Sequence, residues 1–513
     1  MTPQAAPVPG SRRGFLVSTQ SRVLFAAAVA ALYVSLTVAN ALTQRPRIDE
    51  GFFASPAYNL ITHGTMGTTV FSDGDPYLKG IREHTYWVPP LDLLAQAGWY
   101  KIAGFSIFNM RILATMWALV ALGAWYLIMR QLSRDPRIAL LTTAMVGLDY
   151  TFIMCGASGR MDMMSAGLGF SALASYLVLR ERNFAWAVLA SNSLASASGF
   201  THPVGGYLTV AGVVFLTLYF DRKRIRLGHV AMAAIPYLIG AAGWGWYIMK
   251  APQDFLAQFG ANAKMDGRLT GLSAPWLGFW REITDRYAVP FGLGPHSQGN
   301  AGPIYLKVLI LLAYVVGVAG ALLTKEIREN KNYRALMYLS GIYFTLLSVL
   351  DYQKAYYYLI HILPYYGALF VVWMAWCWRR RFLPRPAILA VIGVLFVLQV
   401  GGAAYHDTMN TYGRSYRPAV GFLKQRTLPQ DAIIGSSAFG FGLGFDSNLR
   451  DDIRLGYYTG ERPQYIIVNE EYQWVFRNYE TTAPEVYRFI VARLNNEYRP
   501  IYDYGGIQIY ESK

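Results

Sequence analysis

The chain has 513 residues, of which 54% are hydrophobic and only 15% are charged, a balance too apolar for an ordinary soluble enzyme. The net charge of +15 could suit nucleic acid, but most clustered cations lie in short segments between apolar blocks. No basic face or binding motif accompanies them, so we expect membrane lipids as neighbours and no nucleic acid as a partner.

The apolar residues fall into blocks close to the length of ~20 residues with which a helix crosses a bilayer. Clusters of Arg and Lys near 12–22, 130–137, 180–182, 222–226, 325–334 and 379–385 are typical of cytoplasmic segments. One arrangement, in which successive loops alternate between the two sides of the membrane, places every basic cluster in the cytoplasm. It puts the N-terminus inside and the C-terminus outside. The predicted spans lie near 23–42, 107–129, 138–155, 163–179, 185–200, 204–220, 229–249, 303–323, 335–350, 357–378 and 387–404.

Three segments of the predicted membrane domain, 1–404, need separate interpretation. Ser11–Leu16 resembles a twin-arginine export signal, but we interpret it as the cytoplasmic flank of an uncleaved first span. The apolar segment 89–104, in external loop 1 (43–106), is short for a span. If it crossed the membrane, the basic cluster at 130–137 would lie outside, so we expect a helix on the outer surface instead. Residues 250–302 are polar enough to form an external cap with short helices.

After residue 404 the composition becomes polar and rich in tyrosine. Strand-like runs occur at 432–436, 464–468 and 506–511, and the stretch 484–495 has apolar residues at helical spacing. The expected fold class is therefore mainly α: a polytopic membrane protein of about eleven transmembrane helices, followed by a small external α/β domain at 405–513.

The most informative polar residues are Asp49 and Glu50, an adjacent acidic pair a few residues after the first span. Carboxylates at a membrane exit are unfavourable next to lipid, but they can take a proton from a substrate that arrives through the bilayer. A carboxylate of this pair could therefore act as a general base, a role worth ~10²–10⁴ in rate.

Other candidate substrate-binding residues are predicted on the same external side: Glu50, Tyr58, His84, Arg160, Asp162, His202, Lys354 and Tyr357. Arg160 and Asp162 could instead cap helix ends, and Lys354 could be a snorkelling anchor in an aromatic belt. His202, beside a proline, could mark only a helix break. However, ionisable groups at the membrane level carry a penalty of about 2.5–3.5 kcal/mol at the bilayer centre and less near the interface, so such a cluster suggests function.

The chemistry suggested by this set is displacement at a sugar carbon that bears a phosphate leaving group. A carboxylate would deprotonate the incoming hydroxyl, and the cations would stabilise the charge that grows on the departing phosphate. A phosphate attached to a long lipid would explain a site at the border between membrane and water.

At these residues the chain resembles the polytopic glycosyltransferases of the C-type fold, specifically the family 39/83 group of protein O-mannosyltransferases and the lipid A aminoarabinose transferase. The resemblance covers roughly the first 380 residues. It rests on Ile48-Asp49-Glu50-Gly51, Pro89-Pro90-Leu91 leading into Trp99–Gly104, the Arg160/Asp162 loop, and Lys354-Ala355-Tyr356-Tyr357 running to Pro364.

The resemblance implies that Asp49 is the base, that the donor is a polyprenyl-phosphate sugar, and that transfer inverts the anomeric carbon. It also implies that Glu50 shapes a substrate pocket and that Lys354 holds the phosphate, with Arg160 and His202 assisting. The lipid A-modifying relatives carry a lysine just before the Pro-Pro pair, where this chain has Trp87-Val88. This difference argues against aminoarabinose specificity; His84 is the candidate substitute cation.

Two other functions compete with glycosyl transfer to a lipid, glycan or protein acceptor. A transporter or flippase of lipid-linked saccharides would show repeated halves with broken helices at the midplane, and the sequence shows no such repeat. A membrane receptor would leave Asp49, Arg160 and Lys354 unexplained. We expect no obligatory metal or other cofactor, although a divalent cation beside Asp49 and Glu50 is an alternative. Composition favours a bacterial inner membrane with the C-terminal domain in the periplasm.

Overall fold

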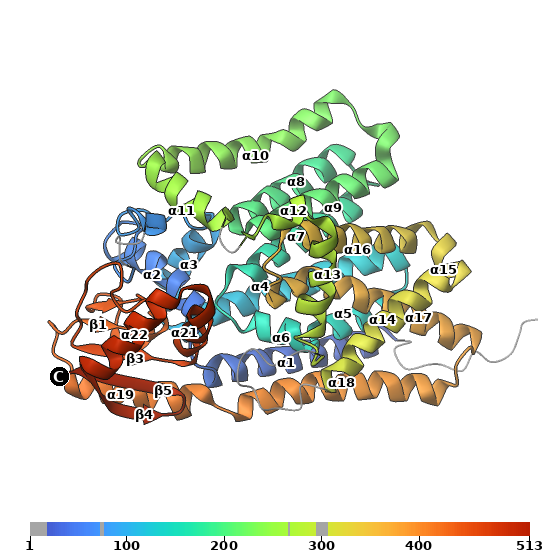
Figure 1. The fold of residues 1–513 in the computed structure, drawn as a ribbon. Helices are drawn as coiled ribbons and strands as arrows, with labels where there is room; N and C mark the ends of the chain where they lie inside the picture. Colours follow the sequence, from blue (N-terminus) through green and yellow to red (C-terminus); the bar gives the residue numbers. More distant parts are fainter. Residues whose placement is uncertain (1–17, 72–75, 265–266, 294–305) are drawn as a thin grey trace, which may run out of the picture.

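A computed structural model of the chain describes residues 18–71, 76–264, 267–293 and 306–513. Most of these residues form α-helices, and a small sheet lies near the C-terminus (Figure 1). The mainly α fold class with a C-terminal sheet is therefore confirmed. The twin-arginine-like segment at 11–16 lies outside the described residues, and its interpretation stays a prediction.

Long helices form a bundle around one large apolar core, and every predicted span is matched by a helix or by a bent helix pair. They are α1 (Thr19–Thr43), α4 (Ile107–Ser133), α5 (Pro136–Gly147) with α6 (Tyr150–Gly156), α7 (Met161–Leu179), α8 (Phe184–Thr201), α9 (Pro203–Asp221), α10 (Leu227–Ile248), α14 (Lys307–Leu323), α16 (Lys331–Leu350), α17 (Leu363–Arg380) and α18 (Arg385–Thr408). Within the described residues, seven helices are long and apolar enough to cross a membrane, or eight if the bent pair is one span. The number of eleven spans stays a prediction.

Glycines allow several of these helices to approach closely. A Cβ added to Gly206 of α9 would lie 2.4 Å from the Cα of Gly199 in α8, and one added to Gly167 of α7 would lie 2.8 Å from the carbonyl oxygen of Trp117 in α4. In lipid, where the surroundings are as apolar as the helices themselves, such close packing is a main source of helix association.

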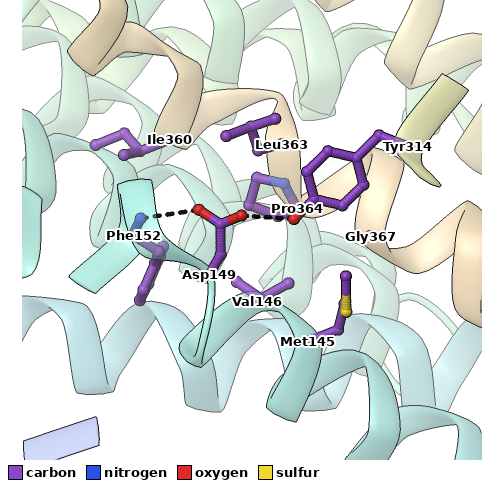
Figure 2. A pocket seen from close by; sticks show the side chains of 9 residues that line it. All are labelled: Met145, Val146, Asp149, Phe152, Tyr314, Ile360, Leu363, Pro364 and Gly367. Carbon is purple, nitrogen blue, oxygen red and sulfur yellow. Dashed lines mark hydrogen bonds between the residues drawn. The ribbon is translucent and has the colours of Figure 1, made fainter. Parts of the chain in front are cut away.

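The predicted span 138–155 is broken at Asp149, where α5 and α6 meet at a bend of 66°. The buried Asp149 carboxylate caps α6 by accepting the Phe152 N–H at 3.1 Å, and it also accepts the Tyr314 hydroxyl at 2.5 Å (Figure 2). Gln399 of α18 donates to the same carboxylate at 3.0 Å and accepts the Tyr150 N–H at 2.7 Å. Polar groups of α14 and α18 therefore satisfy the break within the bundle.

External loop 1 forms helices that lie at one end of the bundle, at the left of Figure 1. They are α2 (Ile48–Thr62), the short η1 (Pro76–Leu78) and α3 (Leu91–Ala103). α3 matches the helix predicted at 89–104; its position on a membrane surface stays a prediction. Asp49 and Glu50 lie in the first turn of α2, where negative charge is favourable to the helix dipole.

The predicted external cap also consists of short helices. They are α11 (Pro252–Lys264), α12 (Thr270–Ser273), α13 (Pro275–Arg281) and the π-helix η4 (Glu282–Ala288). Gln258 of α11 is buried and holds loop 1 in place, because it donates to the carbonyls of Lys79 and His84 and accepts the Tyr86 N–H at 2.7 Å.

The C-terminal region carries a five-stranded mixed sheet with the strand order β2-β1-β3-β5-β4. Its elements are α19 (Arg417–Arg426), β1 (Ile433–Ile434), η8 (Ser437–Phe439), α20 (Gly440–Leu443), β2 (Leu449–Arg450), β3 (Tyr465–Val468), α21 (Glu470–Thr482), α22 (Pro484–Asn496), β4 (Tyr498–Tyr504) and β5 (Ile507–Ser512). The predicted strands at 432–436, 464–468 and 506–511 and the helix at 484–495 are confirmed. The two further strands, β2 and β4, are very short or mostly polar, so no apolar pattern indicates them.

The remaining short elements connect the bundle: η2 (Arg222–Arg224), α15 (Lys325–Glu329), η6 (Tyr356–His361) and η7 (Tyr412–Tyr416). α18 continues past the predicted boundary at residue 404 to Thr408 and is followed closely by η7 and α19. The division into 1–404 and 405–513 stays a prediction.

Candidate functional site

Asp49 lies in the first turn of α2 and forms an ion pair with the Nη1 of Arg160. The two partners differ in exposure, since 44% of the Asp49 side chain is accessible and only 9% of the Arg160 side chain. The carboxylate is therefore fixed from one side and remains open to solvent or a substrate on the other.

Arg160 is the residue that orients Asp49. It precedes α7, donates through Nε to Asp162 at 2.8 Å, and lies over the Tyr357 ring with 3.7 Å between its guanidinium carbon and the ring centroid. Burial would lower the pKa of Arg160, but Asp162 and nearby tyrosine hydroxyls raise it above its ordinary value, so the residue stays cationic. The structure thus brings together four of the residues predicted from the sequence.

Glu50, next to Asp49, points into the protein and is 1% exposed. It forms a bidentate pair with Arg111 of α4 at 2.8 and 2.7 Å, and it accepts the backbone N–H groups of Gly159 and Arg47. Burial would raise the pKa of Glu50, but Arg111 and these N–H groups lower it below its ordinary value, so the buried pair is charged.

The remaining N–H groups of Arg111 donate to the carbonyls of Ala41, Gln44 and Arg45, at the end of α1 and just beyond it. All five donors of this guanidinium are therefore used. The Glu50–Arg111 pair joins α1, α2, α4 and the loop before α7, and it fixes the backbone that carries Asp49. The sequence-based prediction that Glu50 contacts substrate stays a prediction.

The exposed side of Asp49 borders a cavity of about 340 Å³ between loop 1 and the C-terminal region, which we call the aromatic cavity. Its wall consists of Ile48, Asp49, Phe52, Phe71, Tyr77, Leu78, Trp87, Asp451, Asp452, Ile453, Arg454, Tyr458 and Thr459. The carboxylates on this wall number three, and the only cation among these residues is Arg454.

A glycine allows the C-terminal region to close this cavity. A Cβ on Gly51 of α2 would lie 2.3 Å from the carbonyl carbon of Ser437 in η8. Ser437 also donates through Oγ to the carbonyl of Ile48 at 2.9 Å, and the Asp451 N–H donates to the Val70 carbonyl at 2.7 Å. The Gly51 that follows the acidic pair is thus required by a close backbone contact.

A second cavity, of about 660 Å³, is lined by Tyr357, the ring over which the Arg160 guanidinium lies; we call it the cationic cavity. Its wall consists of Arg47, Tyr150, Thr151, Met154, Arg281, Asp285, Val289, Pro290, Phe291, Lys307, Ile310, Gln353, Lys354, Ala355, Tyr356, Tyr357, Gln399, His406 and Trp474. Four Arg or Lys side chains face one carboxylate there, the reverse of the aromatic cavity.

Two of these cations have their charge available for a ligand. Arg47 donates to the Tyr356 hydroxyl at 2.7 Å, and Lys307 lies 4.0 Å from the centre of the Tyr150 ring. Among the described residues, neither has a carboxylate at ion-pair distance, whereas Arg281 is paired with Asp285 at 2.7 Å. Arg47 and Lys307 are therefore best suited to bind an anion.

Lys354 also lines the cationic cavity, but its ammonium group is already fully bonded. It donates to Glu282 at 3.0 Å and to the carbonyls of Leu347 and Ser348 at 3.2 and 2.7 Å. Glu282 binds Arg286 as well, which in turn contacts Asp351. These four buried charges attach the external cap to the loop after α16. The sequence-based assignment of the phosphate to Lys354 stays a prediction.

Three further predicted residues line neither cavity. Tyr58 donates to Asp446 at 2.6 Å, a hydrogen bond that raises the pKa of Tyr58 to about 12. His202 is buried, accepts the Val204 N–H at the start of α9, and lies 3.4 Å from the Tyr358 hydroxyl. His84 stacks on Tyr86 and lines a separate groove between loop 1, α8 and α10. Substrate contact by these residues stays a prediction.

The sequence did not single out Arg111, which supports Glu50, or several residues that line the two cavities. Arg111 gave a signal that could have been used, because it is an arginine inside a predicted span. Arg47, Lys307 and the residues of the C-terminal region gave none, since single charges near span ends are ordinary. As for a metal, the described part of the chain holds no group of three or more His, Cys, Asp or Glu side chains arranged to bind one.

No protein-family model matches the chain. An uncharacterized protein of Aquifex aeolicus is 25% identical over 208 residues, which cover 39% of this chain and 38% of that protein. The matched region is thus well under half of either protein.

The fold is similar to solved structures over nearly the whole chain. ArnT from Cupriavidus metallidurans bound to undecaprenyl phosphate matches with a TM-score of 0.58 at 14% identity, covering 96% of this chain and 98% of ArnT. The oligosaccharyltransferase AglB from Archaeoglobus fulgidus, in complex with an inhibitory peptide and a dolichol-phosphate, matches with a TM-score of 0.52 at 13% identity, covering 96% and 74%. With this likeness over nearly its whole length, the chain is a multi-pass membrane protein with the C-type glycosyltransferase fold of ArnT and AglB.

Proposed function

We propose that the protein is an inverting glycosyltransferase that moves a sugar from a polyprenyl-phosphate donor to an acceptor on the periplasmic side of the membrane. The observation that carries this proposal is the position of Asp49, a half-exposed carboxylate that lines the aromatic cavity and is held by Arg160, which lies over Tyr357 of the cationic cavity. The fold shared with proteins solved in complex with undecaprenyl phosphate or dolichol-phosphate supports a donor of this class.

The donor phosphate binds in the cationic cavity, where Arg47 and Lys307 meet it. The leaving phosphate changes from a diester to a monoester and gains negative charge, which fixed cations stabilise more in the transition state than in the ground state. The Arg160 guanidinium, over Tyr357 at the edge of this cavity, adds to the positive field.

The acceptor binds in the aromatic cavity, with its nucleophilic oxygen beside Asp49. The carboxylate takes the proton of this hydroxyl as the oxygen forms a bond with the anomeric carbon. The bond from that carbon to the phosphate oxygen breaks, and its electron pair leaves with polyprenyl phosphate. A single displacement of this kind inverts the anomeric carbon.

The proposal is tested by Asp49→Asn in the full chain reconstituted into liposomes with a radiolabelled polyprenyl-phosphate sugar. Loss of the base lowers transfer by about 10²–10⁴-fold while donor binding persists. Asp503→Asn, an exposed change in β4 away from both cavities, is the matched control and keeps full transfer. Full transfer by Asp49→Asn, or label that crosses the bilayer without a new glycosidic bond, would reject the proposal, the second result in favour of a transporter.

A further inference from the structure

The aromatic cavity has a charge pattern that restricts what can bind beside Asp49. Its wall combines Asp49, Asp451 and Asp452 with a single cation, Arg454. A phosphate group placed there would meet more negative than positive charge in a partly enclosed site, where charges interact more strongly than in water. An uncharged group meets no such penalty.

The one cation of this wall is held within the wall itself. Arg454 donates to the Tyr77 hydroxyl at 3.1 Å, and its guanidinium carbon lies 5.2 Å from the centre of the Tyr458 ring. Asp452 is also fixed, since it accepts the backbone N–H groups of Arg454 and Gly456 and the hydroxyl of Thr459. The loop from Asp451 to Thr459 is thus a preorganised surface.

The rest of the wall is aromatic and comes from two parts of the chain. Phe52 packs edge-on against Phe71 and Trp87 in loop 1, with ring centroids 4.9 and 5.9 Å apart. Tyr458 of the C-terminal region is 57% exposed. Aromatic faces next to carboxylates suit a sugar ring, whose C–H face packs on the aromatic ring while its hydroxyls donate to the carboxylates.

A protein acceptor fits this cavity less well. Peptides often bind by adding a strand to a free sheet edge, but the edge strand nearest to this wall, β2, has only two residues. A cavity of about 340 Å³ has the size of a small-molecule site rather than of an extended groove.

We infer that the acceptor is an uncharged saccharide unit, bound between loop 1 and the C-terminal region, that offers a hydroxyl to Asp49. This inference rests on the proposed function and narrows its acceptor to a sugar hydroxyl, in place of a phosphate or a protein side chain. The acceptor hydroxyl gives its proton to Asp49, its oxygen bonds to the anomeric carbon of the donor, and polyprenyl phosphate leaves with the electron pair. Tyr458 and Trp87 set specificity by stacking on the acceptor ring.

The test measures binding without a donor, so it does not depend on transfer. The full chain is placed in lipid nanodiscs free of sugar detergent, and saturation-transfer NMR is recorded with three methyl glycosides (glucoside, galactoside and N-acetylglucosaminide). The comparison ligands are methyl glucoside 6-phosphate and a short serine peptide. At least one neutral glycoside shows saturation transfer to its ring protons, and the phosphorylated sugar and the peptide show little.

Variants at the tyrosine locate the binding. Tyr458→Ala weakens glycoside binding roughly threefold to tenfold, as expected for loss of one stacked ring, while Tyr458→Phe keeps it. Tyr504→Ala, an equally exposed tyrosine of the same sheet region, is the matched control. Equal or stronger binding of the phosphorylated sugar, preference for the peptide, no signal from any glycoside, or unchanged binding by Tyr458→Ala would each overturn the inference.

The two proposals fail in different measurements. If the wild-type protein binds a neutral glycoside but transfers no sugar from any polyprenyl-phosphate donor, the proposed function is wrong. If it transfers sugar to a phosphate or to a serine hydroxyl and binds no neutral glycoside, the acceptor inference alone is wrong.

Discussion

One short segment, Arg47 to Asp49, contributes to the walls of both the aromatic and the cationic cavity, yet the charges of the two walls are opposite. Asp49 borders the aromatic cavity, where carboxylates outnumber cations, and Arg47, two residues earlier, borders the cationic cavity, where the balance is reversed. Arg160 links the two cavities, since it pairs with Asp49 of the first and lies over Tyr357 of the second. In the proposed reaction, the cationic cavity binds an anion and the aromatic cavity holds the neutral nucleophile that Asp49 activates.

The two cavities also differ in how their walls are built. Four buried charges around Glu282 and Lys354 hold the wall of the cationic cavity. The aromatic cavity is closed by a backbone contact at Gly51 and by hydrogen bonds from the C-terminal region. The wall of the cationic cavity should therefore be destabilised most by loss of a charge, and the wall of the aromatic cavity by an added side-chain atom.

The largest loss of folding stability is expected for Glu282→Gln. This change leaves the buried ammonium of Lys354 and the guanidinium of Arg286 with one carboxylate fewer, and breaking a buried pair in this way destabilises a protein by about 3–5 kcal/mol. Unfolding of the full chain in detergent by heat or denaturant measures it. Glu329→Gln, which breaks an exposed pair with Lys325, has an effect of about 0–1 kcal/mol. Equal effects of the two changes would mean that the buried charges do not support the cationic wall.

A pH dependence of folding stability is expected at the wall of the aromatic cavity, which includes Asp451. Burial raises the pKa of Asp451 from 3.8 to about 6, even though Ser437 and Tyr472 donate to it. The folded state therefore binds this proton more tightly than the unfolded state, so stability falls as the pH rises from about 4 to about 6. The fall corresponds to roughly 3 kcal/mol for a shift of this size.

Hydrogen exchange of β1 and β3 in the full chain, recorded at several pH values, measures this dependence. Asp451→Asn has no proton to lose and should show a flatter profile between pH 4 and 6. Asp503→Asn should keep the wild-type profile. An unchanged slope in Asp451→Asn would show that another group titrates there.

The assignment of the phosphate to the cationic cavity is tested by Arg47→Gln. Loss of a charge-assisted contact worth about 1.5–3 kcal/mol raises the donor KM by roughly 10- to 150-fold and leaves the acceptor KM unchanged. Tyr458→Ala should produce the reverse pattern. Arg45→Gln, which removes a partly exposed pair with Glu470, is the neighbouring control. A rise in the acceptor KM for Arg47→Gln would contradict the assignment of donor and acceptor to separate cavities.

The smallest change is expected for Gly51→Ala. The added methyl group has no room against Ser437, and overpacking of this kind destabilises by about 1–3 kcal/mol. The C-terminal region should separate slightly from α2, which would raise hydrogen exchange in α2 and η8 and lower transfer. Gly98→Ala, on a helix where the new methyl group meets nothing within 4 Å, should be neutral or slightly stabilising. A neutral Gly51→Ala would show that the contact is not tight.

The amino-acid sequence alone predicts the helices, most of the sheet and the acidic pair that leads the candidate residues. Spans and strands follow from hydrophobic patterns that are local, so each could be predicted without knowledge of its neighbours. The pair of Asp49 and Glu50 could be selected because two adjacent carboxylates beside a membrane span are unusual. The same pattern does not show which of the two side chains is exposed and which is buried.

The folded chain distinguishes Asp49 from Glu50, because the partners of the two side chains lie far away in the sequence. Glu50 meets Arg111 and Gly159, which are 61 and 109 positions further on, and becomes a buried support. Lys354 is likewise neutralised by Glu282, 72 positions earlier. The charges of both cavities depend on such long-range pairs, and the burial and pairing of a charged group follow from the packing of distant segments rather than from its local sequence.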